Sequence, residues 1–317
     1  MTVTFAASAG TRPTRHHKPA VRGRPRSRGI RRTLTGWAFA GPATLIVVGL
    51  SIFPAVWAFF IARTRWNGIA PANDVGWRNY ERIVQDPDMG AAAEHTVVLT
   101  ALFVPAAILL GILFAIALNQ RIRLIGFYRT CIFVPYVASA AATGILASWV
   151  FNPQFGGANA VLNRLGLPQQ QFLESPSQAL FVVCVIALWG EVGFATVVYL
   201  AALQDVPKEL VEAAICDGAS RFRVFLHVTL PALRPVTVFM AIWETITALQ
   251  MFDLIYTTTR GGPLNSTQTV VYYVYELAFQ TQRLGYGAAV AYLLFAVTMV
   301  LTLIVIWYGR RGGREAF

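Results

Sequence analysis

The chain has 317 residues, of which 56% are hydrophobic and only 13% are charged, and its mean hydropathy is +0.54. Ordinary soluble domains carry about 25% charged residues, so this composition excludes a soluble globular protein and indicates an integral membrane protein. The net charge of +11 does not indicate a nucleic-acid partner, because the basic residues are concentrated in one tail and in short loops, without a nucleic-acid-binding motif.

The first 36 residues, Met1–Gly36, contain nine lysines and arginines and no acidic residue. This basic segment is longer than that of a cleavable signal peptide, and the apolar segment after it is also longer. We therefore predict a disordered cytoplasmic tail followed by an uncleaved membrane anchor. The three cysteines, Cys131, Cys184 and Cys216, have neither disulfide nor metal spacing, so we expect no metal site.

Six segments have the length and apolar character that a bilayer-spanning helix needs, about 20 residues each. They are Trp37–Ile61, Thr96–Asn119, Tyr128–Val150, Ala179–Leu203, Pro235–Tyr256 and Tyr286–Tyr308. The predicted fold is all-α, a polytopic membrane protein with six transmembrane helices. It divides into the tail 1–36, a transmembrane domain 37–308 and a cytoplasmic C-terminal tail 309–317.

The distribution of lysine and arginine sets the expected orientation, because cytoplasmic loops are enriched in these residues. With the amino terminus inside, nineteen of the 26 lie on the cytoplasmic side and seven lie outside. Both termini are therefore predicted to be cytoplasmic. The segment Gly76–Val84 then lies outside, as an interfacial helix with aromatic anchors at Trp77 and Tyr80.

The loop 204–235, between the fourth and fifth spans, is predicted to hold a short polar helix over Val206–Gly218. Pro207 suits a first helical turn, and Glu209 and Glu212 lie near the positive end of the helix dipole. Gly218 offers a stop. Small side chains on this helix would allow close approach by a partner protein, although an amphipathic helix resting on lipid headgroups fits the composition equally well.

Three groups of residues in this loop resemble the EAA loop of permease subunits in binding-protein-dependent ABC importers: Glu212-Ala213-Ala214, Asp217-Gly218-Ala219 and Leu230-Pro231. A second set is similar to the signature of the carbohydrate branch, the maltose and glycerol-3-phosphate type: Phe252-Asp253, Thr259, Gly261-Gly262-Pro263 and Thr267. The resemblance covers Trp37 to Tyr308. It implies the type I ABC importer permease fold, with a cytoplasmic coupling helix.

This resemblance implies a multi-pass subunit of the bacterial cell membrane that works with a second homologous permease, an ATPase dimer and an extracellular solute-binding protein. The loop residues expected to couple to the ATPase are Glu212, Ala213, Ala214, Asp217, Gly218, Ala219 and Pro231. The sequence has no phosphate-binding loop, so ATP and Mg²⁺ are expected on the partner ATPase. We expect no cofactor, no catalytic residue and no enzymatic activity in this chain.

Two glutamates at membrane depth, Glu191 and Glu244, each lie close to a tryptophan, Trp189 and Trp243. Ionisable groups there cost about 2.5–3.5 kcal/mol on insertion scales and usually face a cavity or a partner. An aromatic face beside a carboxylate suits a sugar. Alternatively, each glutamate pairs with a polar group of the sister permease or is protonated among buried neighbours.

The resemblance places seven residues on the expected substrate path: Gly190, Glu191, Phe194, Glu244, Thr247, Ala248 and Met251. Two nearby carboxylates would repel a phosphate dianion, which favours a neutral polyol, an oligosaccharide or an amine-bearing solute. A glycerophosphodiester with a cationic head group avoids this repulsion. A glycerophosphodiester, glycerol-3-phosphate and an amino sugar are the alternative substrates, and an ion-driven secondary transporter is the alternative class of protein.

Overall fold

The computed structural model describes residues 27–120 and 123–311. Residues 1–26 of the predicted basic tail and residues 312–317 of the predicted C-terminal tail therefore lie outside the described part. The chain forms two compact units, residues 1–55 and 56–317, and each is described by itself.

In the first unit, α1 (Ser27–Val47) is followed by a π-helical turn, η1 (Val48–Ile52), and by the start of α2 (Phe53–Ala62). The apolar stretch Thr35–Ala62 is long enough to cross a membrane and matches the first predicted span. Helix α1 begins earlier than expected, so residues 27–36 are helical and not part of a disordered tail. Extending a formed helix costs little, because each added residue makes one hydrogen bond without a new nucleus.

The second unit begins within α2, continues with a short antiparallel hairpin, β1 (Thr64–Arg65) with β2 (Asn73–Asp74), and its remaining regular elements are helical. Its first group of helices is α3 (Arg78–Gln85), α4 (Pro87–Leu118), α5 (Ile125–Val137), α6 (Ala140–Val150), α7 (Gly157–Arg164), η2 (Phe172–Glu174) and α8 (Ala179–Gln204). The second group is α9 (Lys208–Cys216), α10 (Arg221–Val224), η3 (Phe225–Thr229), α11 (Leu230–Ala232), α12 (Arg234–Leu249), α13 (Asp253–Thr258), α14 (Val270–Tyr275), η4 (Glu276–Gln280) and α15 (Leu284–Arg311).

Four further helical stretches of the described chain have the length and apolarity of membrane spans, and they match four of the predicted segments. They are Pro87–Leu118, Ala179–Gln204, Arg234–Thr258 and Leu284–Gly309. Helix α8 agrees with its predicted bounds to one residue. The fifth segment is interrupted at residues 250–252, where α12 ends and α13 begins.

The third predicted span differs from expectation, because it is not one straight helix. Helices α5 and α6 are bent by 101° at a short break. The break falls at Ala138 and Ser139, which both adopt extended backbone angles. Their neighbours are apolar, so a hydropathy window does not detect this change of direction. Counted together, the pair gives the sixth span.

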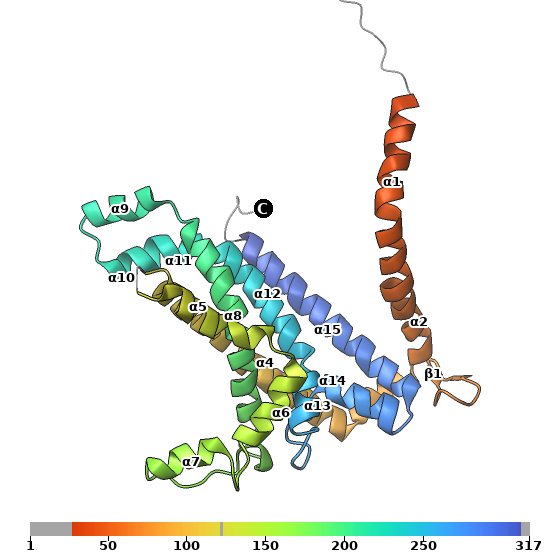
Figure 1. Cartoon of the computed structure of the whole chain (residues 1–317). Coiled ribbons are helices and arrows are strands. Elements are labelled where there is room, and N and C mark those ends of the chain that lie inside the picture. Colours follow the sequence, from red (N-terminus) through yellow and green to blue (C-terminus); the bar gives the residue numbers. More distant parts are fainter. Residues whose placement is uncertain (1–26, 121–122, 312–317) are drawn as a thin grey trace, which may run out of the picture. The chain divides into compact units, whose positions relative to one another are not determined.

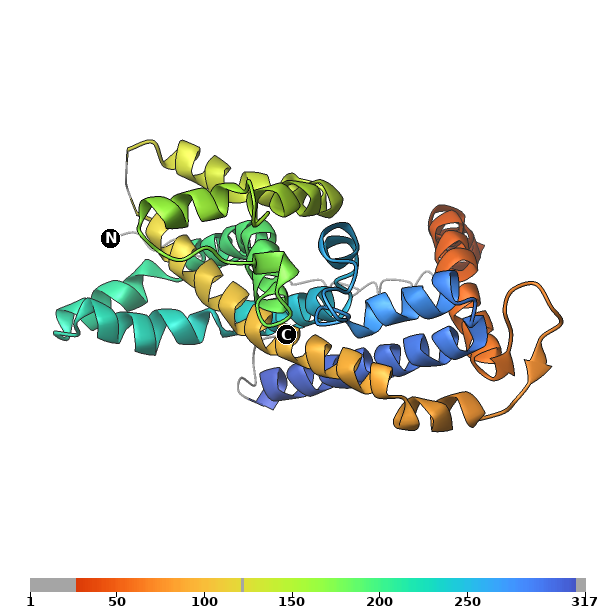
Figure 2. The same ribbon diagram turned by 90° about the horizontal axis from the view of Figure 1, so that it is seen from below.

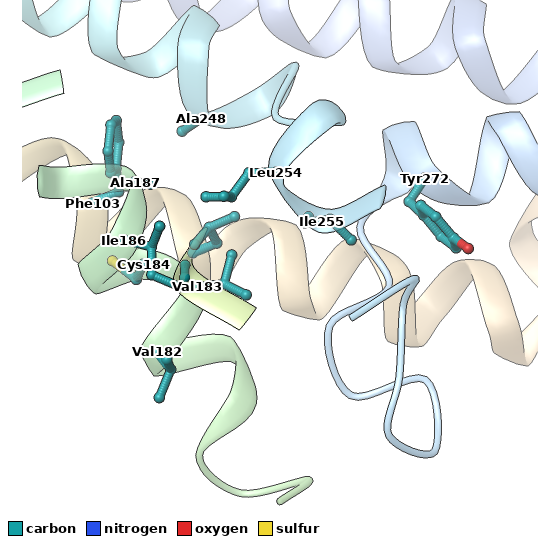
Figure 3. Packing of buried hydrophobic residues seen from close by; sticks show 12 residues of the cluster. Phe103, Val182, Val183, Cys184, Ile186, Ala187, Ala248, Leu254, Ile255 and Tyr272 are labelled. Carbon is teal, nitrogen blue, oxygen red and sulfur yellow. The ribbon is translucent and has the colours of Figure 1, made fainter. Parts of the chain in front are cut away.

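Close packing holds α4 against α8 and α8 against α5. A Cβ atom on Gly111 of α4 would lie 2.7 Å from the Cβ of Ala195 on α8. Figure 3 shows a neighbouring part of the core, where side chains of α4, α8 and α13, among them Phe103, Val183 and Leu254, pack together. Helices α14 and α15 lie side by side in Figures 1 and 2 and share a second apolar cluster.

Gly193→Ala is expected to lower the free energy of unfolding of the purified transporter by about 1–3 kcal/mol, the usual cost of overpacking. The added Cβ would lie 2.5 Å from the backbone oxygen of Ile132 on α5. A backbone atom cannot move aside as the end of a flexible side chain can. Gly190→Ala, one turn earlier on α8, is the matched control, since its Cβ meets nothing within 4 Å. Equal thermal unfolding midpoints for the two variants would contradict this packing.

The segment expected to form an interfacial helix outside the membrane is helical, as α3. Asp86 follows it and caps α4, accepting hydrogen bonds from the hydroxyls of Tyr273 at 2.8 Å and Tyr286 at 2.6 Å. Burial of the Asp86 carboxyl acts to raise its pKa, but these bonds and those from the backbone N–H groups of Met89 and Asp88 hold the pKa below its ordinary value. This carboxylate thereby joins α4 to α14 and α15.

The Gly-Gly-Pro signature residues form a loop between α13 and α14 that is held by threonine hydroxyls. Thr267 donates to the backbone oxygen of Gly262 at 2.9 Å, and its hydroxyl lies 2.7 Å from that of Thr259. Gly261 has a φ of +82°, and a Cβ there would lie 2.9 Å from the ring of Tyr272. The signature therefore has a structural explanation, because the glycine permits the turn and the two threonines close it.

Candidate functional site

The loop that resembles the EAA motif contains the predicted short helix, α9. It begins directly after Pro207, and its end is closed by a pair of hydrogen bonds, from Gly218 N–H to Ile215 oxygen and from Ala219 N–H to Ala214 oxygen, both 3.0 Å. This is a Schellman motif, which needs a residue with positive φ after the helix. Gly218, with a φ of +80°, supplies it.

Helix α9 has no buried residue, so its surface is free in the described chain. Glu212, Ala213 and Asp217 are exposed, while Ala214 and Ala219 are half-buried. The helix also exposes the apolar side chains of Leu210 and Ile215. Of the seven predicted coupling residues, six therefore lie on α9 or its C-terminal turn. Pro231 lies apart from them in the chain, on α11, and lines a groove with residues of α12 and α15.

A cleft of about 250 Å³ opens where α5, α6, α8, α12 and α13 meet. Four of the seven predicted path residues line it: Gly190, Glu191, Thr247 and Met251. Its inner wall includes Ile186 and Leu254, which also belong to the buried core, so the cleft rests on well-packed helices. Gly190 and Glu191 come from α8, Thr247 comes from α12, and Met251 lies in the interruption after α12, far from α8 in the sequence.

The other three predicted path residues do not line this cleft. Glu244 is fully buried, at 0% exposure, and neither of its carboxylate oxygens has a hydrogen-bond partner among the described residues. Ala248 is buried in the core beside the cleft. Phe194 is half-buried and packs against other aromatic rings. A buried carboxyl without a partner is costly, and at 0% exposure Glu244 is enclosed by side chains of its own chain.

Five aromatic side chains form a continuous row from α5 across α8 to α12, here called the aromatic row: Phe133, Tyr136, Phe194, Trp243 and Phe239. The rings of Tyr136 and Phe194 stack with centroids 5.1 Å apart, and those of Phe194 and Trp243 lie 5.0 Å apart. Tyr136 also lines the cleft. Trp189, expected beside Glu191, is instead exposed and lines none of the cleft.

The cleft contains polar residues that sequence reasoning did not assign to it, notably Asp253, Gln250 and Tyr136. Asp253 is exposed and is the first residue of α13, directly after the interruption between α12 and α13. A signal was present, because Phe252-Asp253 belongs to the signature, but nothing in the sequence indicated the interruption that turns this carboxylate to the cleft.

All charged residues in the lining of this cleft are acidic. It contains two carboxylates, Glu191 and Asp253, and no lysine, arginine or histidine among the residues that form it. Such a lining accepts hydrogen bonds from hydroxyl or ammonium groups and repels anions. No group of three or more histidine, cysteine, aspartate or glutamate side chains that could hold a metal ion occurs in the described residues.

Comparison of the sequence with known protein families decides where this chain belongs. Residues 107–311 match the family described as "Binding-protein-dependent transport system inner membrane component". The chain belongs to this family. Family membership makes it a membrane component of a transport system, and the predicted all-α importer permease fold is confirmed.

Proteins similar to this chain include permeases that are named for several sugars. The diacetylchitobiose uptake system permease protein NgcF of Streptomyces coelicolor is 37% identical over 333 residues, covering 99% of this chain and 93% of its own. The sulfoquinovosyl glycerol transport system permease protein SmoG of Agrobacterium fabrum is 33% identical, covering 84% and 87%. Among solved structures, a bacterial ABC transporter for the acidic polysaccharide alginate has the same fold, with a TM-score of 0.80, 22% identity and coverage of 90% and 98%.

Proposed function

We propose that this permease is the translocation subunit of an ATP-driven importer for sugars or related polyhydroxy solutes. One observation carries the proposal: the two helices that bracket the exposed loop helix α9 both lead to the cleft. Helix α8 brings Glu191 to the cleft and ends at Gln204, where the loop begins. Helix α12 starts after the loop at Arg234 and brings Thr247 to the cleft.

This connection gives a mechanical route from an ATPase to the solute. Both Glu191–Gln204 and Arg234–Thr247 are 13 residues apart within one helix, which corresponds to about 20 Å. An unbroken helix of this length moves as a rigid rod, so displacement of α9 shifts the walls of the cleft. In this proposal α9, with Glu212, Ala213, Ala214, Asp217, Gly218 and Ala219, docks onto the ATPase, and Pro231 turns the chain back toward α12.

The proposed solute is uncharged or bears an amine. The carboxylates of Glu191 and Asp253 in the lining oppose an anion, and the adjacent aromatic row offers flat apolar faces for sugar rings. Some relatives are named for neutral sugars, such as diacetylchitobiose or trehalose and maltose. Others are named for sn-glycerol-3-phosphate or sulfoquinovosyl glycerol, and these anionic solutes are the less favoured alternative for this chain.

The proposed assembly contains a second homologous permease, two ATPase subunits that bind ATP and Mg²⁺, and an extracellular solute-binding protein. The chain itself acts without a cofactor and without its own enzymatic activity. Both termini and α9 lie on the cytoplasmic side, as the lysine and arginine distribution favours.

Purification of the tagged chain from its own host membrane is expected to bring down an ATPase and a second six-span permease. The assembled complex should hydrolyse ATP faster when the solute-loaded binding protein is added. An ion-driven transporter would instead purify alone and take up solute in response to an ion gradient. Active uptake by the isolated chain in ATP-free vesicles would therefore overturn the proposal.

A further inference from the structure

A second cleft, of about 440 Å³, lies between the β1–β2 hairpin loop, α3 and the start of α15. Four arginines from separate segments line it: Arg65, Arg78, Arg82 and Arg283. Its lining includes no aspartate or glutamate. Four like charges in one cleft repel each other, and a bound anion would relieve this repulsion.

Two carboxylates near this arginine cleft have hydrogen-bond partners of their own. Asp86 accepts hydrogen bonds from two tyrosines, and Asp74 accepts one from the backbone N–H of Gly76 at 2.7 Å. Arg82 lies over the ring of Tyr286, with its guanidinium carbon 4.7 Å from the ring centroid. The cleft lining thus provides aromatic support for one guanidinium but no carboxylate, and Asp86 is joined to it through the hydroxyl of the lining residue Tyr286.

Two arginines that line the cleft lie next to the ends of candidate membrane spans in the sequence. Arg65 follows the candidate span Thr35–Ala62 by three residues, and Arg283 directly precedes the span Leu284–Gly309. Beside it, Trp77 is 56% exposed and Ile69 is 83% exposed. Exposed aromatic and apolar side chains beside basic residues are typical of the headgroup level of a bilayer.

This group of four arginines is unusual under the positive-inside rule. Seven arginines lie on the side predicted to be outside, where arginine is disfavoured, and four of them line this one cleft. We propose that the arginine cleft binds the phosphate of an anionic phospholipid headgroup at the outer surface of the membrane. The flanking Trp77 and Ile69 favour a lipid over an acidic segment of a docked protein, because their side chains can enter the adjacent acyl region.

The test compares the complete transporter complex in vesicles of phosphatidylcholine and in vesicles that also contain phosphatidylglycerol. Native mass spectrometry should show phosphatidylglycerol retained by the wild-type complex. The double variant Arg65→Gln with Arg283→Gln should lose this retention at least about tenfold, since two cations near an anionic headgroup are removed. The matched control is Arg164→Gln with Arg260→Gln, which removes two outer arginines away from the cleft and should retain phosphatidylglycerol as the wild type does.

Three results would overturn the proposal. The first is equal retention of phosphatidylglycerol by the double variant and the wild type. The second is saturable binding of inorganic phosphate to the complex in phosphatidylcholine vesicles without any preference for phosphatidylglycerol, which would indicate a free-anion site. The third is a loss of binding-protein affinity in the double variant that is independent of lipid composition. If the double variant does not assemble, Arg283→Gln alone and the salt dependence of retention in the wild type supply the same comparison.

Discussion

Replacing Ala213 by arginine is expected to lower solute uptake by the assembled transporter at least about tenfold, with the permease still inserted in the membrane. Ala213 lies exposed on α9, whose short side chains allow a partner surface to approach closely. A long charged side chain at that contact separates the two surfaces and buries an unpaired charge, which costs several kcal/mol at an interface. The measurement is uptake of labelled solute together with recovery of the ATPase on the tagged permease.

The matched control is Asn119→Arg, which adds the same bulk and charge at an exposed position after α4 on the same predicted side of the membrane. Recovery of the ATPase should fall for Ala213→Arg and stay at the wild-type level for Asn119→Arg. If Ala213→Arg retained both its ATPase and full uptake, α9 would not be the coupling element.

Glu191→Gln is expected to raise the solute concentration for half-maximal uptake about tenfold to a hundredfold. A hydrogen bond to a charged group contributes about 1.5–3 kcal/mol, and the neutral amide loses that charge while keeping the shape. Glu191 lines the cleft, so a solute hydroxyl or amine can reach it. Concentration-dependent uptake in reconstituted vesicles, with the maximal rate measured separately, reports this change.

Glu244→Gln provides the comparison within the same pair of acids. Glu244 is fully buried and outside the cleft lining, so its replacement should change the half-maximal concentration less than Glu191→Gln does. A structural effect would instead show as a change in the thermal unfolding midpoint of the purified transporter, because Glu244 is enclosed by its own chain. Unchanged uptake and unchanged solute preference in both variants would remove these acids from the substrate path.

The helical spans and the loop helix follow closely from the sequence. Uninterrupted apolarity places α8 to within one residue, because a bilayer-spanning helix must satisfy its backbone internally over a fixed thickness. The end of α9 was also predictable, since only a residue that tolerates positive φ closes the helix there, and Gly218 is that residue. These features depend on local chemistry and on the thickness of the membrane.

Other features of the site could not be read in this way. The 101° bend between α5 and α6 lies within an apolar segment, where hydropathy is the same for a straight and a bent path. Asp253 reaches the cleft only because α12 ends at Leu249 and α13 starts afresh. The aromatic row joins residues that are separated by up to about a hundred positions, and stacking of this kind is decided by packing alone.

The sequence by itself determined that this chain is a membrane permease of a binding-protein-dependent transport system, with its spans and its loop helix, because apolar length and short motifs are local properties. Only the tertiary structure decided which of the predicted residues share a cleft and which are buried beside it. It also brought four arginines from separate segments into one cleft. Contacts between helices far apart in the chain depend on how their surfaces pack, which no local pattern records.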